Sequence, residues 1–234
     1  MFARNTKYEY SNCHMMLIKP SNGKNFKNGC IYIKGGVGFE QRDAHVEADS
    51  LQEGVYFFYV EMDWVIQESY NDFEFSATSY GPAECIFEEV TQDFPQHVVL
   101  KRAIVAESEL GGENIMQVAM EHKNAPSIVK LTTKKATESG YLWTLVKNGE
   151  KDKRYKQVVN YTKFEGLTLL KPFEGNKYEL SCEAGQANCV IIKCNTNGYA
   201  FQEEISEQVI VPDEHLINLC IINGKPSERA PGIV

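Results

Sequence analysis

The sequence lacks the paired cysteines and histidines that mark most metal and redox sites. Its seven cysteines are an odd number with no C-x-x-C pair, and its five histidines include no H-x-x-x-H pair. Zinc sites usually show such pairs, so the loose group Cys182, Cys189 and Cys194 does not predict one. The odd count also argues against a disulfide framework. We expect free, mostly buried thiols in a reducing, cytoplasmic compartment.

Long apolar runs are also missing. No stretch approaches the roughly 20 apolar residues that a transmembrane helix needs. The beginning of the chain, MFARNTKYEYSNCHMML, has no hydrophobic region typical of a signal peptide. The sequence therefore predicts neither a membrane span nor secretion. Because 43% of the 234 residues are hydrophobic, we expect an ordered core rather than general disorder.

Basic residues are absent from Asp43 to Leu100, which gives the chain a charge asymmetry. Residues 1–94 carry 15 acidic and 7 basic residues, whereas residues 95–234 carry 17 of each. The net charge of -8 therefore comes from residues 1–94. The stretch from Lys123 to Lys156 holds nine basic residues and three acidic ones. We expect an acidic end and a basic patch.

Strand patterns dominate the first half. Val55 to Trp64 is aromatic and β-branched, and Asp72 to Tyr80 alternates between apolar and polar residues, as a half-buried strand does. We predict that these two segments form an antiparallel pair within a β-sandwich. Further short strands are predicted at 13–18, 30–34, 44–49 and 84–90.

A short helix over 94–109 is predicted to link the first half to a second domain, with the boundary near Phe94-Pro95. Eight strands then complete a second sandwich. Their predicted ranges are 115–121, 127–132, 141–147, 155–161, 167–170, 177–182, 187–194 and 207–211. Residues 215–222 are apolar and are expected to dock on the body, and 223–234 read as a flexible tail.

Two stretches resemble the calpain family of cysteine proteases, especially divergent members from ciliated protists. GVYFFYVEMDW followed by FSATSYGP resembles the C2-like sandwich called calpain domain III, and YTKFEGLTLLKPFEGNKYEL with CVIIKCNTNGYAF resembles a second one. The resemblance implies an all-β chain of two tandem C2-like antiparallel sandwiches. The expected domains are 1–94, a partial sandwich with an acidic face; 95–222, a second sandwich with a basic patch; and the tail, 223–234.

The chain starts partway into the family pattern, so the first sandwich is expected to lack strands and to expose a sheet edge. A partner strand, or residues 2–10 folding back, would cover that edge. The papain-like core of the family, with its Cys, His and Asn, is not in this sequence. Because cysteine catalysis needs a thiolate beside an imidazole, we predict a protein without enzymatic activity and without a bound cofactor.

Calcium is the one metal for which the sequence offers candidate ligands. Carboxylates at Asp43, Glu47 and Asp49 lie in the acidic half, and the family resemblance brings in an acidic loop. Ca²⁺ needs six to eight convergent oxygens, and no D-x-D-x-D loop is present. A solvated acidic face is the simpler interpretation.

Two surfaces are predicted to bind partners. The first is the aromatic and acidic face of the strand in residues 55–64, formed by Phe57, Tyr59, Glu61 and Asp63, with the core expected on the opposite face at Phe58, Val60 and Met62. The second is the basic patch at Lys134, Lys135, Lys153 and Arg154, which suits an acidic protein surface such as tubulin. The net acidity argues against nucleic acid, and a solvated loop is the alternative interpretation of the patch.

The sequence thus predicts an interaction or scaffold subunit of a larger complex, associated with the cytoskeleton or a cilium by analogy with the family. One alternative is the regulatory C-terminal part of a calpain-like protease. The other is a Ca²⁺-dependent C2-like binding module.

Overall fold

The fold is built from antiparallel β-sheets and one helix. The computed structural model describes residues 11–22, 25–64, 76–90, 96–118 and 125–211. The elements within them are β1 (Asn12–Asn22), β2 (Asn25–Gly38), β3 (Phe57–Asp63), α1 (Gln96–Leu110), β4 (Ile115–Val118), β5 (Ile128–Thr133), β6 (Tyr141–Asn148), β7 (Arg154–Glu165), β8 (Leu167–Leu169), β9 (Lys177–Cys182), β10 (Ala187–Cys194) and β11 (Ala200–Ile210). Of the described helical residues, no segment is both long and apolar enough to cross a membrane.

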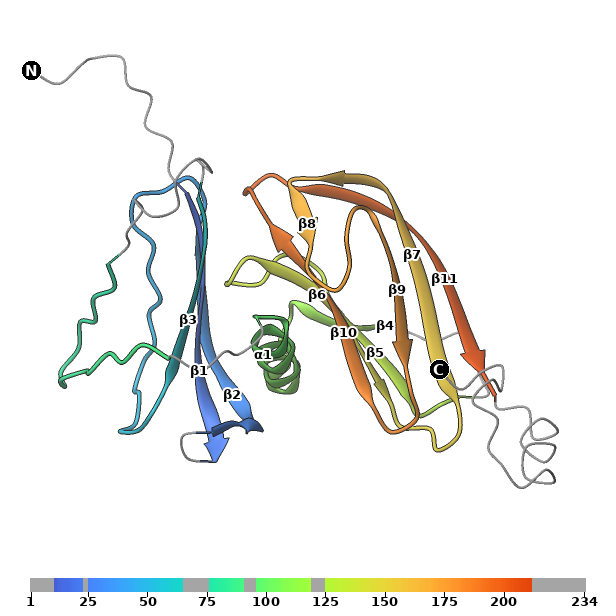
Figure 1. Cartoon of the computed structure of the whole chain (residues 1–234), viewed down its shortest axis with the longest axis horizontal. Helices are drawn as coiled ribbons and strands as arrows, with labels where there is room; N and C mark the ends of the chain where they lie inside the picture. The colour runs from blue at the N-terminus through green and yellow to red at the C-terminus, as the bar shows by residue number, and fades with distance from the viewer. Residues whose placement is uncertain (1–10, 23–24, 65–75, 91–95, 119–124, 212–234) are drawn as a thin grey trace, which may run out of the picture.

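The first half forms one three-stranded sheet, the N-terminal sheet, in the order β2-β1-β3 (Figure 1). The central strand β1 pairs with both neighbours, for example His14 opposite Glu61 and Met16 opposite Tyr59. Residues 76–90 follow without regular secondary structure, and all of them are exposed.

The second half forms two antiparallel sheets that face each other. A five-stranded sheet runs in the order β4-β5-β6-β10-β8, and a three-stranded sheet runs in the order β11-β7-β9. The core between them combines Leu142, Val146 and Ile192 from the first sheet with Tyr155 and Leu180 from the second. This layer of interdigitated side chains is the usual core of a β-sandwich.

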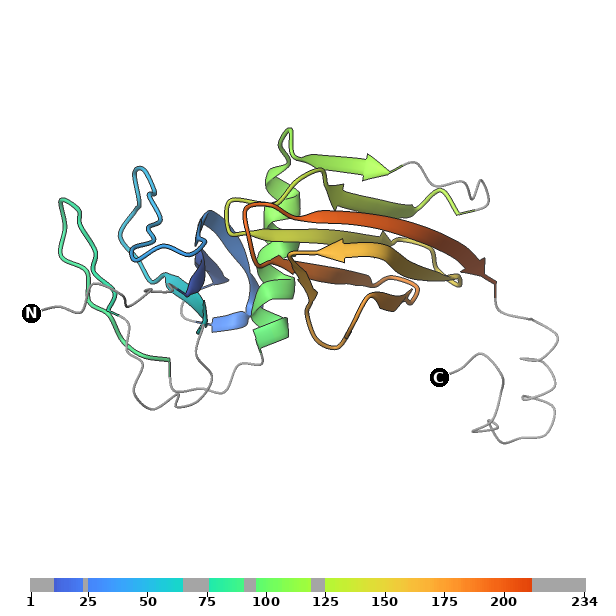
Figure 2. The same cartoon turned by 90° about the horizontal axis from the view of Figure 1, so that it is seen from above.

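Helix α1 and the N-terminal sheet cover the other face of the five-stranded sheet (Figures 1 and 2). Leu100 and Ala103 of α1 share a buried cluster with Ile18 of β1 and Trp143 of β6. The indole nitrogen of Trp143 donates a hydrogen bond of 2.9 Å to Glu107 of α1. The helix is therefore a packed part of the core and not a free linker between domains.

Burial on both faces explains the sequences of β6 and β10, which read as nearly continuous apolar runs. Within β6, Leu142 and Val146 face the sandwich interior, while Tyr141, Trp143 and Leu145 face the helix and the N-terminal sheet. Every residue from Cys189 to Cys194 of β10 is buried. The fold is thus a stack of sheets with the five-stranded sheet inside.

The structure confirms the antiparallel, mostly β architecture, and each of the eight strands predicted after the helix has a counterpart. The first half differs. The predicted strands at 44–49 and 84–90 are wrong, because neither segment has strand structure, and 84–90 is exposed throughout. Of the strand predicted at 72–80, residues 76–80 have no strand either, and 72–75 lie outside the described residues. The Phe94-Pro95 boundary and residues 2–10 and 215–234 also lie outside them.

The position of α1 generates a prediction about stability. Leu100 is 1% exposed and Leu110, on the same helix, is 62% exposed. Leu100→Ala leaves a cavity between α1 and the five-stranded sheet, so we expect the free energy of unfolding to fall by about 2–5 kcal/mol. Leu110→Ala is the matched control and should change it by less than about 0.5 kcal/mol. Urea unfolding followed by tryptophan fluorescence measures both, and equal effects would show that α1 is not packed as described.

Candidate functional site

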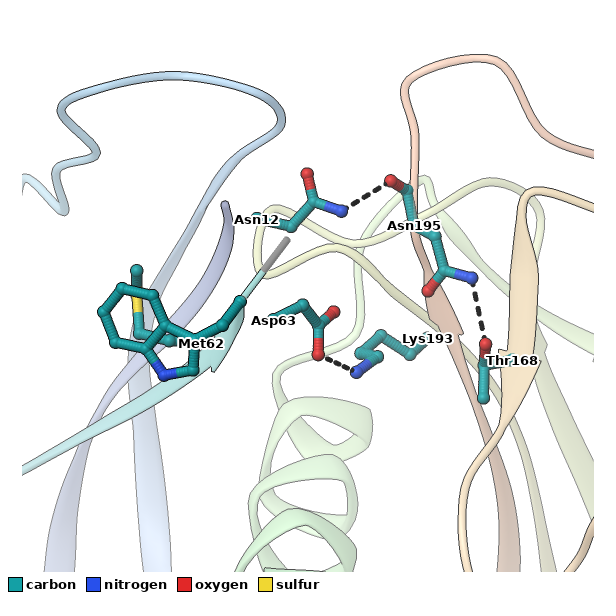
Figure 3. A pocket seen from close by; sticks show the side chains of 7 residues that line it. Asn12, Met62, Asp63, Thr168, Lys193 and Asn195 are labelled. Carbon is teal, nitrogen blue, oxygen red and sulfur yellow. Dashed lines mark hydrogen bonds and ion pairs between the residues drawn. The ribbon is translucent and has the colours of Figure 1, made fainter. Parts of the chain in front are cut away.

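Charged side chains meet where β3 of the N-terminal sheet crosses β6 and β10 of the five-stranded sheet. Lys193 of β10 extends its ammonium to two carboxylates of β3, at 2.9 Å from Glu61 Oε1 and 2.6 Å from Asp63 Oδ1. Figure 3 shows the side chains of Asp63 and Lys193 pointing toward each other between the two layers. We call the group of Glu61, Asp63, Lys193, Tyr59 and Tyr141 the seam.

Two phenols complete the seam. The hydroxyls of Tyr59 and Tyr141 both donate to Glu61 Oε2, at 3.0 Å and 2.8 Å. Burial would raise the pKa of Glu61, but the hydrogen bonds and charge of Lys193 and the two phenols lower it overall below 4.5. Burial also raises the pKa of the Tyr141 phenol, which therefore stays protonated and donates.

The ammonium of Lys193 stays charged in this setting. Burial alone would lower its pKa, but the hydrogen bonds that it donates to Asp63 and Glu61, and their negative charge, raise the pKa overall above 10.5. A lysine acts as a nucleophile or base only when its pKa is depressed, and a carboxylate acts as a general base at neutral pH only when its pKa is raised. The charge states of the seam therefore suit structural pairing better than acid–base chemistry.

The imidazole of His14 lies buried behind the seam. Its Nδ1 lies 2.9 Å from the carbonyl oxygen of Ser139, and because a carbonyl only accepts, Nδ1 carries the proton. Its Nε2 is buried and has no hydrogen-bond partner among the described residues. The ring packs 5.0 Å from the ring of Tyr141, measured between centroids. Burial lowers the pKa of His14, so the neutral form is favoured.

Gly140 allows this close approach of the two layers. Its φ is +80°, and a Cβ at this position would lie 2.7 Å from Nδ1 of His14. Both the left-handed backbone and the missing side chain are therefore required here.

A polar cleft of about 410 Å³ opens beside the seam. Its lining residues come from both layers and are Asn12, Met62, Asp63, Trp64, Thr168, Lys193 and Asn195 (Figure 3). Hydrogen bonds already hold its polar walls together: Asn12 donates to the carbonyl of Asn195 at 2.7 Å, and Asn195 donates to Thr168 at 2.9 Å. The cleft thus marks the junction of the layers and is braced by the chain itself.

Two cysteines of β10, Cys189 and Cys194, are buried and free. Burial raises the pKa of Cys189 to about 11 and that of Cys194 to about 12, so both thiols stay protonated at neutral pH. Because the thiolate is the nucleophile, these buried cysteines are poor candidates for catalysis.

The aromatic and acidic face predicted to bind a partner is covered by the same chain. Phe57 and Tyr59 pack against the buried cluster of α1 and β6, and Glu61 and Asp63 join the seam. The core predicted at Phe58, Val60 and Met62 faces the other way, and Phe58 is exposed. The assignment of the two faces is therefore reversed. Both faces of this strand carry aromatic residues, so alternation alone does not tell which face is covered.

The four basic residues predicted to form a patch divide into two pairs. Lys153 binds Glu150 at 3.0 Å, and Arg154 binds Glu183 at 2.7 Å, so their charge is partly neutralised within the chain. Lys134 and Lys135 are exposed on the turn after β5, whose backbone is held by Asn114.

The predicted calcium ligands Asp43, Glu47 and Asp49 lie on the exposed connection between β2 and β3. Within the described part of the chain, no three His, Cys, Asp or Glu side chains gather where they could hold a metal ion. Calcium binding stays a prediction.

Comparison with known proteins gives no relative: no family model, no curated protein and no solved structure matches the chain. The sequence singles out Tyr59, Glu61 and Asp63 of the seam as a contact face, but it does not show that their partners are Tyr141 and Lys193 of the same chain. The signal for the partner is Lys193 itself, a lysine inside the apolar run of β10. A buried lysine requires a carboxylate partner, but its partner Glu61 lies 132 residues away in the sequence.

The seam predicts that Lys193 is needed for stability. Lys193→Met leaves the Glu61 carboxylate buried without its cation, and we expect a loss of about 3–5 kcal/mol in the free energy of unfolding. Adding Glu61→Gln removes the uncompensated charge and should restore part of this loss. Urea unfolding of the single and double variants measures the coupling.

Lys163→Met is the matched control, because Lys163 pairs with Glu165 at the surface with both side chains about half exposed or more. It should cost less than about 1 kcal/mol. If Lys163→Met and Lys193→Met cost the same, the seam does not hold the layers together.

Because His14 is buried, we expect the stability of the folded chain to fall in acid. Its folded pKa lies below 6.5, so protons bind preferentially to the unfolded chain and stability falls as the pH drops below about 6.5. Glu61, whose folded pKa lies below 4.5, adds a second loss only at pH values below 4.5. NMR titration of the His14 ring should show a neutral Nδ1–H imidazole at pH 6.5. A charged ring at that pH would contradict the burial described.

Proposed function

We propose that the chain is a non-catalytic interaction subunit of a larger assembly, associated with the cytoskeleton or a cilium. In this proposal residues 115–210 are a C2-like sandwich, and the N-terminal sheet is the counterpart of an incomplete first one. The two facing sheets of the second half support the assignment of residues 115–210 to a sandwich. The family resemblance of the sequence is the only support for the cytoskeletal setting.

One observation carries the proposal: an acidic segment with large apolar side chains projects into solvent at residues 76–90. Tyr80 is 94% exposed, and Ile86, Phe87 and Val90 are exposed as well. Glu84, Glu88 and Glu89 accompany them, all exposed. Figure 1 places this segment at the end of the molecule away from the sandwich. Exposed apolar side chains gathered in one segment favour docking to another protein.

The basic residues Lys134 and Lys135 supply a second contact of opposite charge. They suit an acidic surface such as that of tubulin, whereas residues 76–90 suit a basic, apolar groove. A subunit with both could connect two different components of an assembly.

Sedimentation of the full chain with a purified cytoskeletal fraction from the cells of origin tests the proposal. We expect the wild-type chain in the pellet. Ile86→Ser with Phe87→Ser removes apolar contact area and should leave most of the chain in the supernatant. Leu110→Ser is the matched control, because Leu110 is equally exposed but outside the segment, and it should pellet like the wild type.

A second arm uses purified microtubules. Lys134→Glu with Lys135→Glu should release the chain, while the equally exposed pair Lys171→Glu and Lys177→Glu should not. A wild-type chain that stays in the supernatant in both arms would overturn the cytoskeletal assignment. Equal pelleting of the Ile86→Ser, Phe87→Ser variant would show that residues 76–90 are not the docking segment.

A further inference from the structure

The strand β11 has one edge that no described strand pairs with. It runs for 11 residues and is hydrogen-bonded to β7 alone within the described sheets. Figure 1 shows it on the outer side of the sandwich, beyond β7. Apart from an irregularity between Gln202 and Glu203, its pairing with β7 is regular. A long edge of this kind presents a row of free N–H and C=O groups.

The side chains of β11 that point into the sandwich are only partly covered. Ile205 lies opposite Val159 of β7 and shares its face, yet Ile205 is 46% exposed and Val159 is 0% exposed. Phe201, whose ring meets that of Tyr161 edge-on, is exposed too. The interior of the sandwich is therefore open toward the β11 edge.

The facing sheet is open on the same side. Lys130 of β5 reaches across the sandwich to Glu207 of β11, at 2.5 Å, so these two strands face each other. The edge strand β4 lies next to β5, and its Met116 pairs with Thr132, on the same face as Lys130. Met116 is exposed. Apolar side chains from both sheets thus border one unfinished side of the sandwich.

The charge of the edge decides which chain can complete it. The strand β11 carries Glu203, Glu204 and Glu207 and no lysine or arginine. Antiparallel pairing with a second copy centred on Ile205 would place Glu203 opposite Glu207 of that copy, and like charges directly opposite on neighbouring strands repel. The acidic residues therefore disfavour self-association and favour a strand that carries basic side chains.

We propose that the open edge of β11 is a strand-addition site for an extended segment of a partner protein in which basic residues alternate with apolar ones. The backbone of that segment would pair with β11. On the inner face its apolar side chains would cover Phe201 and Ile205, and on the outer face its basic side chains would meet Glu204, which lies opposite Asn160. This inference deepens the proposed interaction function, but it names a surface distinct from residues 76–90.

A peptide titration of the full chain tests the site. The probe is an end-capped octapeptide of alternating lysine and valine. We expect NMR shift changes centred on β11 and slower hydrogen exchange of alternate β11 amides. The same peptide with every backbone amide N-methylated has no N–H group to donate on either edge, cannot pair as a strand and should not bind. A glutamate–valine octapeptide should not bind either. Binding of the N-methylated peptide, or shift changes away from β11, would overturn the proposal.

A charge exchange provides the matched variants. Glu204→Lys should weaken the binding of the lysine peptide about tenfold and strengthen that of the glutamate peptide. Glu113→Lys makes the same charge change at an exposed position outside β11 and should bind like the wild type. Ile205→Ser should also weaken binding, since it removes exposed apolar area. Equal affinities across these variants would overturn the proposal.

Two other occupants of the edge are distinguishable. If the β11 amides that point away from β7 are protected from exchange before any peptide is added, the edge is already covered and the proposal fails. Sedimentation velocity then shows whether a second copy covers it, and truncation after Val211 shows whether the chain's own last residues do.

The peptide assay is independent of the cytoskeletal fraction. Peptide binding without sedimentation would reject the cytoskeletal setting alone, and sedimentation without peptide binding would reject the β11 site alone.

Discussion

The burial of the five-stranded sheet on both faces is the constraint on which the rest of the structure depends. One face packs on the sheet of β7, β9 and β11, and the other packs on α1 and the N-terminal sheet. Because β6 and β10 are apolar on both faces, loss of either cover would expose a continuous apolar surface to water. The N-terminal sheet is thus a layer of the same core, although the sequence suggests a separate domain.

Two buried lysines fix the order of these layers. Lys193 points from the five-stranded sheet to the carboxylates of β3, and Lys130 points from its opposite face to Glu207 of β11. Each lysine would be costly to bury without its carboxylate. Any other placement of the covering sheets would leave a charge unpaired, so the ion pairs select this arrangement while apolar burial supplies most of its stability.

Patterns along the chain predict the second half well and the seam only in part, because they single out Glu61 and Asp63 but not their partner Lys193. The strands β9 and β10 coincide with their predicted ranges, because alternation and turn residues are local signals. The faces of β3 were reversed, since the residues that cover it are distant in the sequence: Tyr141 and Lys193 lie 80 and 132 positions from Glu61. The same distance hides the Lys193–Glu61 pair. A lone lysine in a buried strand shows that a partner exists, but only the fold shows which carboxylate it is.

The charge run of the sequence also overstates the basic surface. Within residues 123–156, Lys130 is buried against Glu207, and Lys156 binds Glu179. Lys134 and Lys135 are among the few that remain exposed. The acidic residues of 76–90 and Glu203 and Glu204 of β11 remain exposed instead, each beside apolar side chains. Figure 1 places these two surfaces at opposite ends of the molecule. Because two such surfaces cannot be covered by one small partner, their separation favours a subunit that joins components over one that caps a single partner.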